Sequence, residues 1–97
     1  MHKLIVTEKA QDDLDLIDRY SLEQFGNAVG SESMDGFLAV FARLKAYPES
    51  GPLYPDVSPT IRCITYRTHK LFYDFDGEVI VIRRVMHSAM NAAQILN

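Results

Sequence analysis

The 97-residue sequence has one cysteine, no tryptophan and no apolar run that approaches the length of a membrane span. A spanning helix needs about 20 consecutive apolar residues. The apolar stretch near the amino terminus is short and is followed directly by charged residues, which does not fit a secretory signal. The lone Cys63 cannot form an intramolecular disulfide, and its apolar neighbours predict a buried thiol in a reducing compartment. We therefore expect a cytoplasmic protein without a membrane segment.

Motifs of common catalytic and cofactor sites are also missing. The sequence contains no Gly-rich phosphate-binding loop, no nucleophile elbow and no Ser-His-Asp arrangement. The three histidines, His2, His69 and His87, do not have metal-ligand spacing, and no cysteine or carboxylate completes a site with them. The four aspartates between residues 12 and 18 spread around a predicted helix, and we interpret them as a solvated face. We expect neither a metal nor a cofactor.

Charge is distributed unevenly along the chain, whose formal net charge is −3 at pH 7. Residues 1–60 contain five Lys or Arg against ten Asp or Glu, and residues 61–97 contain five against three. A protein that binds polyanions needs a concentrated basic patch, so we do not expect direct binding to nucleic acid. The length and the 47% apolar content fit one domain, residues 1–97, with a single core and two faces of different charge.

Two amphipathic helices are predicted in the first half. Thr7 offers an N-cap to a helix over residues 8–24, in which apolar residues recur at helical spacing. Residues 25–27 break this helix, Asn27 can cap the next one, and Pro48 ends it. The very short connection predicts an antiparallel helical hairpin. The apolar stripe of the second helix includes Met34, Phe37, Leu38, Phe41 and Leu44.

Four strands are predicted, one before the helices and three after them. They comprise residues 2–7, 61–67, 70–75 and 78–87. Asp76-Gly77 predicts a hairpin turn, since both of its positions favour positive φ, and residues 68–70 predict a second turn. Residues 48–59 are rich in Pro, Gly and Ser and predict a surface loop. The core is predicted to comprise Leu14, Ile17, Phe37, Phe41, Leu44, Ile64, Phe72, Val81 and Val85.

The order β-α-α-β-β-β predicts an α+β two-layer domain. The helical hairpin covers one face of a mostly antiparallel sheet, and the other face stays open. After the last strand, a short C-terminal helix is expected to contact the domain through Ile95 and Leu96.

Arg83 and Arg84 follow a run of β-branched residues in the last predicted strand. Adjacent residues of a regular strand point to opposite faces, so Arg84 is placed with Ile80 and Ile82. Arg83 shares the other face with Val81. One guanidinium must therefore lie on the helix-covered side, bound to a carboxylate or to carbonyls, and the other can face a partner.

Several short motifs point to a family. A Pro-x-x-Gly loop (Pro48–Gly51) follows the second helix, and an Ile-Arg pair (Ile61-Arg62) begins the next strand. Together with the order of elements and the end of the chain, these motifs resemble the ParE branch of the ParE/RelE toxin superfamily over essentially the whole chain. Asn91 stands where this family usually has Asp, and either residue can cap a short helix. The residues that carry the resemblance at the end of the chain are Arg84, Val85, His87, Met90 and Leu96.

The resemblance implies a toxin of a bacterial type II toxin–antitoxin pair. Such a protein would inhibit DNA gyrase by binding, without catalysis, and a cognate antitoxin would neutralise it in a hetero-oligomeric complex. Many relatives carry paired arginines after the histidine, where this chain has Ala89 and Met90, so no role of those arginines is transferred. The candidate residues for contact with the antitoxin or the target are Arg62, Arg67, Arg83, Arg84, His87 and Met90.

Two other functions stay open. A RelE-like ribosome-dependent mRNA endonuclease would need a base, an acid and a cation at the scissile phosphate. Residues 88–97 offer no titratable side chain, an acidic protein binds RNA poorly, and a lone His87 is more typical of a hydrogen-bonded structural group. The second alternative is a non-toxic relative that retains only antitoxin binding, because the paired arginines are replaced.

Overall fold

The computed structural model describes the backbone of residues 2–55 and 61–96, and the side chains in these ranges except those of residues 27–31 and 93. Its elements are β1 (Lys3–Val6), α1 (Glu8–Phe25), α2 (Asn27–Ala46), β2 (Leu53–Tyr54), β3 (Ile61–Tyr66), β4 (His69–Phe75), β5 (Val79–His87) and α3 (Ala92–Leu96). In the part of the chain that the structure describes, no helix is both long enough and apolar enough to cross a membrane.

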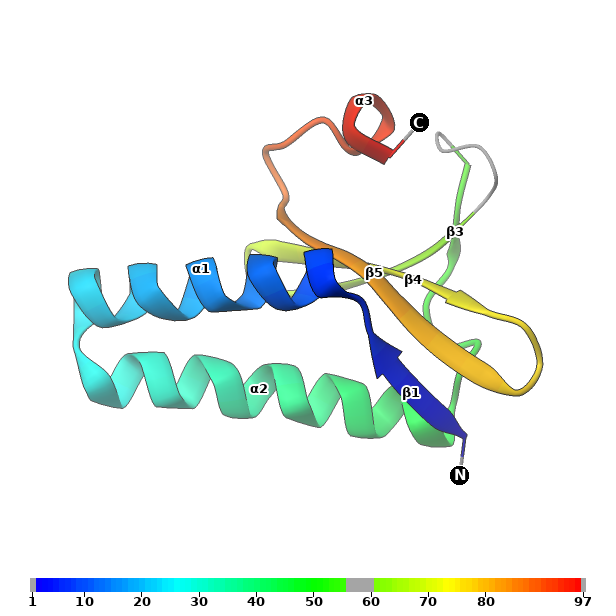
Figure 1. Ribbon diagram of the computed structural model, residues 1–97, viewed down its shortest axis with the longest axis horizontal. Helices are drawn as coiled ribbons and strands as arrows, with labels where there is room; N and C mark the ends of the chain where they lie inside the picture. Colours follow the sequence, from blue (N-terminus) through cyan, green and yellow to red (C-terminus); the bar gives the residue numbers. More distant parts are fainter. Residues whose placement is uncertain (1, 56–60, 97) are drawn as a thin grey trace.

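The two long helices form the predicted hairpin (Figure 1). Thr7 caps α1 as predicted, because its Oγ1 accepts a hydrogen bond from the backbone N–H of Ala10 at 3.1 Å. Gly26 alone separates the helices and adopts a φ of 86°, a conformation that favours glycine. The N-cap position of α2 is this glycine, so the prediction that Asn27 caps the second helix is wrong. With one residue between them, the helices have to run antiparallel.

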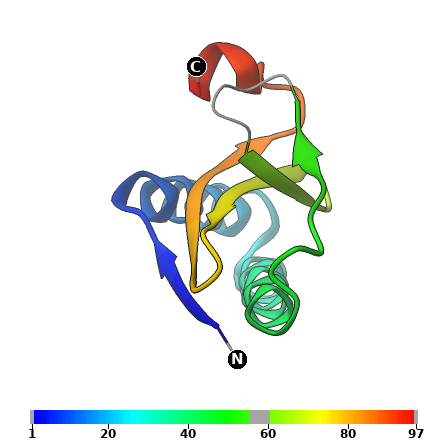
Figure 2. The same cartoon turned by 90° about the vertical axis from the view of Figure 1, so that its right-hand side faces the viewer.

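The five strands form one sheet in the order β1-β5-β4-β3-β2. Only β1 pairs in parallel, with β5, and the other pairs are antiparallel, as predicted. The short strand β2 lies within residues 48–59, which were predicted as loop throughout. Of that predicted loop, residues 56–59 lie outside the described residues. Figure 2 looks nearly along α2 and shows the strands between this helix and α3.

The turn between β4 and β5 lies at the predicted place but differs in conformation. Of its two central residues only Gly77 has a positive φ, 101°. Asp76 instead accepts the backbone N–H groups of Glu78 and Val79 on its Oδ1, each at 2.8 Å. The hydrogen bonds from Val79 and then Glu78 lower the pKa of the Asp76 carboxyl. This turn is therefore stabilised by a side-chain carboxylate as well as by a glycine.

The turn between β3 and β4 is displaced from its predicted position. Arg67, with a φ of 56°, and Thr68 form it, so His69 and Lys70 belong to β4 rather than to the turn. The displacement places His69 directly opposite His87 of β5.

A bulge in β5 reverses the alternation of its side chains. The register with β4 shifts in the middle of the strand and leaves Arg83 as an extra residue. Ile82 before the bulge and Val85 after it therefore pack in the same cluster, although a regular strand would separate them. The prediction that Arg84 shares a face with Ile80 and Ile82 is wrong for this reason.

The main core lies between the helical hairpin and the sheet. It consists of Ala10, Leu14, Phe37, Phe41, Leu44, Leu71, Tyr73, Ile80, Ile82 and Val85. Five of the nine predicted core residues belong to it, and Ile17 and Ile64 pack against it partly buried. Val81 is half-exposed and Leu38 is 61% exposed, so their predicted places in the core and in the helix stripe are wrong. The hydrophobic stripe of a helix predicts which of its faces packs inward. The extent of the sheet determines how much of that stripe is covered.

A second cluster covers the face of the sheet that was predicted to be open. It consists of Ile61, Cys63, Phe72, Met86 and Ala92, with Tyr54 and Leu96 packed against it. Asn91 accepts the backbone N–H of Gln94 at 3.2 Å and so caps α3, as expected. Of the two predicted contacts of α3, Leu96 is confirmed, but Ile95 is exposed. The buried Cys63 is confirmed, and burial raises the pKa of its thiol.

Candidate functional site

A groove of about 600 Å³ opens between α1, the β3–β4 turn and the segment after β5. We call it the α1 groove. Asp13 to Phe25 of α1 contribute one wall, and the turn residues, the end of β5 and Met90 contribute the other. In Figure 1 the helical hairpin extends beyond the strands on this side of the molecule. The hairpin therefore presents apolar side chains that the sheet does not cover.

The wall on α1 is apolar and exposed. Leu16, Tyr20 and Phe25 are 60%, 60% and 62% exposed. The Tyr20 and Phe25 rings pack edge to face, with centroids 6.4 Å apart. Leu16 and Tyr20 flank the buried stripe of α1, and Met90, 49% exposed, lies on the opposite wall. Exposed apolar side chains gathered in one concave region are typical of a protein-binding surface.

The polar end of the α1 groove contains Arg67, His69 and His87. Arg67 lies 3.8 Å from Glu32 of α2, with both side chains largely exposed, and its guanidinium lies over the Tyr66 ring. The imidazole centroids of His69 and His87 are 5.5 Å apart. Burial, and secondarily His87, lower the pKa of His69. Of the predicted contact residues, Arg67, His87 and Met90 are thus brought together in one groove.

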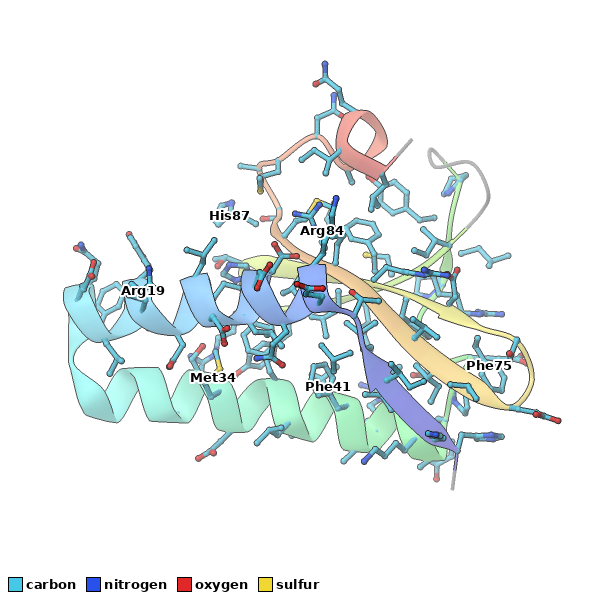
Figure 3. The ribbon with its side chains drawn as sticks, in the orientation of Figure 1. Arg19, Met34, Phe41, Phe75, Arg84 and His87 are labelled. Carbon is cyan, nitrogen blue, oxygen red and sulfur yellow. The ribbon has the colours of Figure 1, made fainter. Side chains whose placement is uncertain are left out.

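His87 is hydrogen-bonded, as its structural interpretation predicted. Its Nδ1 accepts the backbone N–H of Ala89 at 3.0 Å, and its carbonyl accepts the N–H of Met90 at 3.0 Å. Figure 3 shows the ring above α1, on the side of the carboxy-terminal segment. The side chain therefore fixes the direction in which the chain leaves β5 and the position of Met90.

Arg84 binds α1 instead of facing a partner freely. Its Nε and Nη2 donate to the two carboxylate oxygens of Asp13 at 2.8 and 3.1 Å, and the Val85 N–H donates to the same carboxylate at 3.0 Å. The two charged side chains are only 22% and 14% exposed. The hydrogen bond with Asp13 raises the pKa of Arg84. Arg84 is bound to a carboxylate, as expected for one of the two arginines, although it does not share the face of Ile80 and Ile82. The interpretation of Asp13 as part of a solvated face is wrong.

Arg83 is also paired. Its Nε lies 2.6 Å from Oδ2 of Asp74 on β4, and both side chains are substantially exposed. Both guanidiniums therefore have a carboxylate partner, but Arg83 remains exposed and can face a partner, as expected for one of the two arginines. An exposed pair of this kind contributes little to stability and leaves Arg83 accessible.

Arg62 holds the Pro48–Gly51 loop. Its Nη1 donates to the Gly51 carbonyl at 2.8 Å. The hydroxyl of the fully buried Tyr73 donates to the Pro48 carbonyl at 2.7 Å and accepts the Gly51 N–H at 2.9 Å. Burial raises the pKa of the Tyr73 phenol, so it stays a neutral donor. The Pro-x-x-Gly motif and the Ile-Arg motif are therefore parts of one hydrogen-bonded unit, away from the α1 groove.

Most residues of the α1 groove were not predicted from the sequence. Leu16 and Tyr20 were not among the candidate contact residues, and His69 was assigned to a turn. The available signal was that these two apolar residues widen the stripe beyond what a small sheet can cover. Within residues 2–55 and 61–96 no three His, Cys, Asp or Glu side chains lie close enough to hold a metal ion.

The chain is similar to known proteins over most of its length. The family model of the ParE toxin of the type II toxin–antitoxin system parDE matches residues 4–92. Toxin ParE3 of Caulobacter vibrioides is 32% identical over 93 residues, which is 96% of this chain and 93% of that protein. The structure of the chromosomal ParDE TA system from P. aeruginosa matches with a TM-score of 0.77 and 22% identity, over 90% of this chain and 96% of that one. The chain belongs to the ParE toxin family of type II toxin–antitoxin systems.

Proposed function

We propose that this toxin acts by binding DNA gyrase rather than by catalysis, and that a cognate antitoxin neutralises it by filling the α1 groove. The observation that carries the proposal is the exposed apolar wall of Leu16, Tyr20 and Phe25 opposite Met90. A flexible segment that folds onto such a surface loses conformational entropy and regains free energy by burying apolar area. The assignment of gyrase as the target comes from the family.

The predicted contact residues divide into two groups in this proposal. Arg67, His87 and Met90 line the α1 groove and would contact the antitoxin directly. Arg83 is exposed beside Asp74 and could exchange this partner for an acidic group of the antitoxin or the target. Arg62 and Arg84 are committed to internal hydrogen bonds, so their contribution to binding would be indirect.

An endoribonuclease is the second candidate, and the cluster of Arg67, His69 and His87 is the observation that favours it. Two imidazoles and a guanidinium are groups that could transfer protons and stabilise a phosphorane-like charge. Two features favour the binding function instead. The Nδ1 of His87 is occupied by the Ala89 N–H, and the groove beside the cluster is lined by apolar side chains that do not suit a phosphate backbone.

A supercoiling assay tests the proposal. The purified toxin should inhibit DNA supercoiling by gyrase in proportion to the toxin added, and equimolar antitoxin, encoded beside the toxin gene, should restore the activity. Ribosome-dependent mRNA cleavage that is abolished by His87→Ala would support the second candidate. Antitoxin binding without an effect on gyrase or mRNA would indicate a non-toxic relative.

A further inference from the structure

His69 and His87 form a pair at the polar end of the α1 groove. They lie directly opposite each other on the antiparallel strands β4 and β5, with their rings at 81° and their centroids 5.5 Å apart. The His69 ring also lies edge-on to Phe37, at 6.0 Å, and is half-buried, whereas His87 is exposed. The pair is thus built into the sheet and faces the groove.

The two rings differ in the hydrogen bonds that their nitrogen atoms make. The Nδ1 of His87 accepts the Ala89 N–H, so its proton lies on Nε2 and a second proton on Nδ1 would break this bond. A metal ion on Nε2 would likewise need a protonated Nδ1, which makes the pair a poor metal site. His69 has no such backbone donor, and its Nδ1 lies 3.4 Å from the Thr68 hydroxyl. Of the two rings, His69 is the one that can take up a proton without losing a backbone hydrogen bond.

The charged groups around the His69–His87 pair do not cancel one another. The titratable groups that line the groove are Asp13, Tyr20, Tyr66, Arg67, His69 and His87. The negative charge of Asp13 is already compensated by Arg84, and Glu32 of α2 approaches Arg67 only to 3.8 Å at an exposed position. Lys70, which follows His69, lies over the Tyr54 ring instead. The polar end of the groove therefore carries the Arg67 guanidinium and two imidazoles, with no uncompensated carboxylate among the described residues that line it.

We propose that the His69–His87 pair binds a carboxylate of the antitoxin segment that fills the α1 groove, and that His69 takes up a proton when the complex forms. The inference rests on the proposed function, because it assumes that the antitoxin occupies the groove. The Nε2–H of His87 donates to the carboxylate, and protonated His69 pairs with it in a partly desolvated position. Antitoxin affinity therefore depends on pH.

The direction in which antitoxin affinity changes with pH follows from the thermodynamic linkage between proton uptake and binding. Burial lowers the pKa of His69 in the free toxin, and a carboxylate beside the ring raises this pKa in the complex. The complex then binds more protons than its separate parts, so affinity rises as the pH falls from the pKa in the complex to the pKa in the free toxin. Uptake of one proton changes the Kd by up to about tenfold per pH unit in this window.

The experiment measures the Kd of the full-length toxin for the full-length antitoxin at intervals from about pH 8 to about pH 5.5, across the ordinary histidine range. We expect the Kd of the wild type to decrease on acidification and the Kd of His69→Gln to be independent of pH. His87→Leu should weaken binding by a similar factor at every pH, because it removes the donor and leaves the proton acceptor, His69, in place. The matched control is His2→Gln, since His2 packs against Phe75, away from the groove, and this variant should behave as the wild type.

The outcomes separate the inference from the proposed function. A Kd of the wild type that does not change with pH, or a slope that His69→Gln retains, would overturn the inference while antitoxin binding stands. An absence of antitoxin binding at every pH would overturn the proposed function itself. Circular dichroism of each variant confirms that the comparison is made between folded proteins.

Discussion

β4 contributes to two regions that differ in how far their side chains find partners within the protein. Near its end, Tyr73 holds the Pro48–Gly51 loop through two buried hydrogen bonds, and Arg62 adds a third from β3. At its start, His69 lines the α1 groove, where Tyr20 and Phe25 of the helix remain largely exposed. The loop region satisfies its polar groups internally, whereas the groove region leaves apolar side chains exposed.

We expect this difference to separate the residues that determine stability from those that determine binding. A buried polar group that loses its hydrogen-bond partner has a large unfavourable effect on folding, so changes in the loop region should lower stability and leave antitoxin binding intact. Exposed apolar side chains contribute little to folding, so changes in the α1 groove should lower affinity and leave stability intact.

Phe41→Ala should have the largest effect on stability and sets the scale for the other variants. Phe41 is buried in the main core, where truncation removes apolar contacts and leaves a cavity. We expect the free energy of unfolding to decrease by about 3–5 kcal/mol, measured by chemical denaturation. A decrease of less than about 1 kcal/mol would mean that this face of α2 does not pack on the sheet.

Tyr73→Phe tests the loop region alone. The change keeps the ring but removes the hydroxyl, so the Pro48 carbonyl and the Gly51 N–H lose their buried partner. We expect a loss of about 2–3 kcal/mol in the free energy of unfolding, with antitoxin affinity unchanged within about twofold. Unchanged stability together with weaker antitoxin binding would show that the loop, not the groove, contacts the partner.

Gly36→Ala tests the connection between α2 and the groove. In most helices this substitution stabilises by up to about 1 kcal/mol. Here the added Cβ would overlap the hydroxyl and ring of Tyr66, which lines the groove and packs on Phe37. We therefore expect a loss of about 1–3 kcal/mol, because the ring has to move.

A double-mutant cycle provides the control for Gly36→Ala. In a Tyr66→Ala background the steric overlap is absent, so the same substitution should be neutral or stabilising. A loss of equal size in both backgrounds would place the strain elsewhere than at the Tyr66 ring.

The sequence predicted the elements better than the details that shape the site. Helical spacing, the Thr7 cap and Gly26 located both long helices, because these signals depend on residues close in sequence. The bulge at Arg83 leaves no such signal, since the run of β-branched residues reads as a regular strand. Once the bulge is missed, the orientation of Arg84 cannot be predicted.

The candidate site was only partly predictable for a related reason. Four aspartates on α1 look equivalent in sequence, and only the position of Arg84 in the folded sheet selects Asp13 as its partner. The exposure of Leu16 and Tyr20 depends on how far the sheet extends beneath the hairpin, which is a property of the tertiary structure. Arg67, His87 and Met90 were named as candidates because they belong to motifs of the family or lie near them, and the structure places them in the groove.

The affinity of the antitoxin for two matched variants tests the central claim most directly. Leu16 in the α1 groove and Leu38 on the outer side of α2 are 60% and 61% exposed, so a glutamate at either position should disturb folding equally little. We predict that Leu16→Glu raises the Kd for the antitoxin by at least about tenfold, since it places a charge in an apolar contact, and that Leu38→Glu changes it by less than about twofold. Equal effects of the two variants, or a larger effect of Leu38→Glu, would contradict the assignment of the α1 groove as the surface that binds the antitoxin.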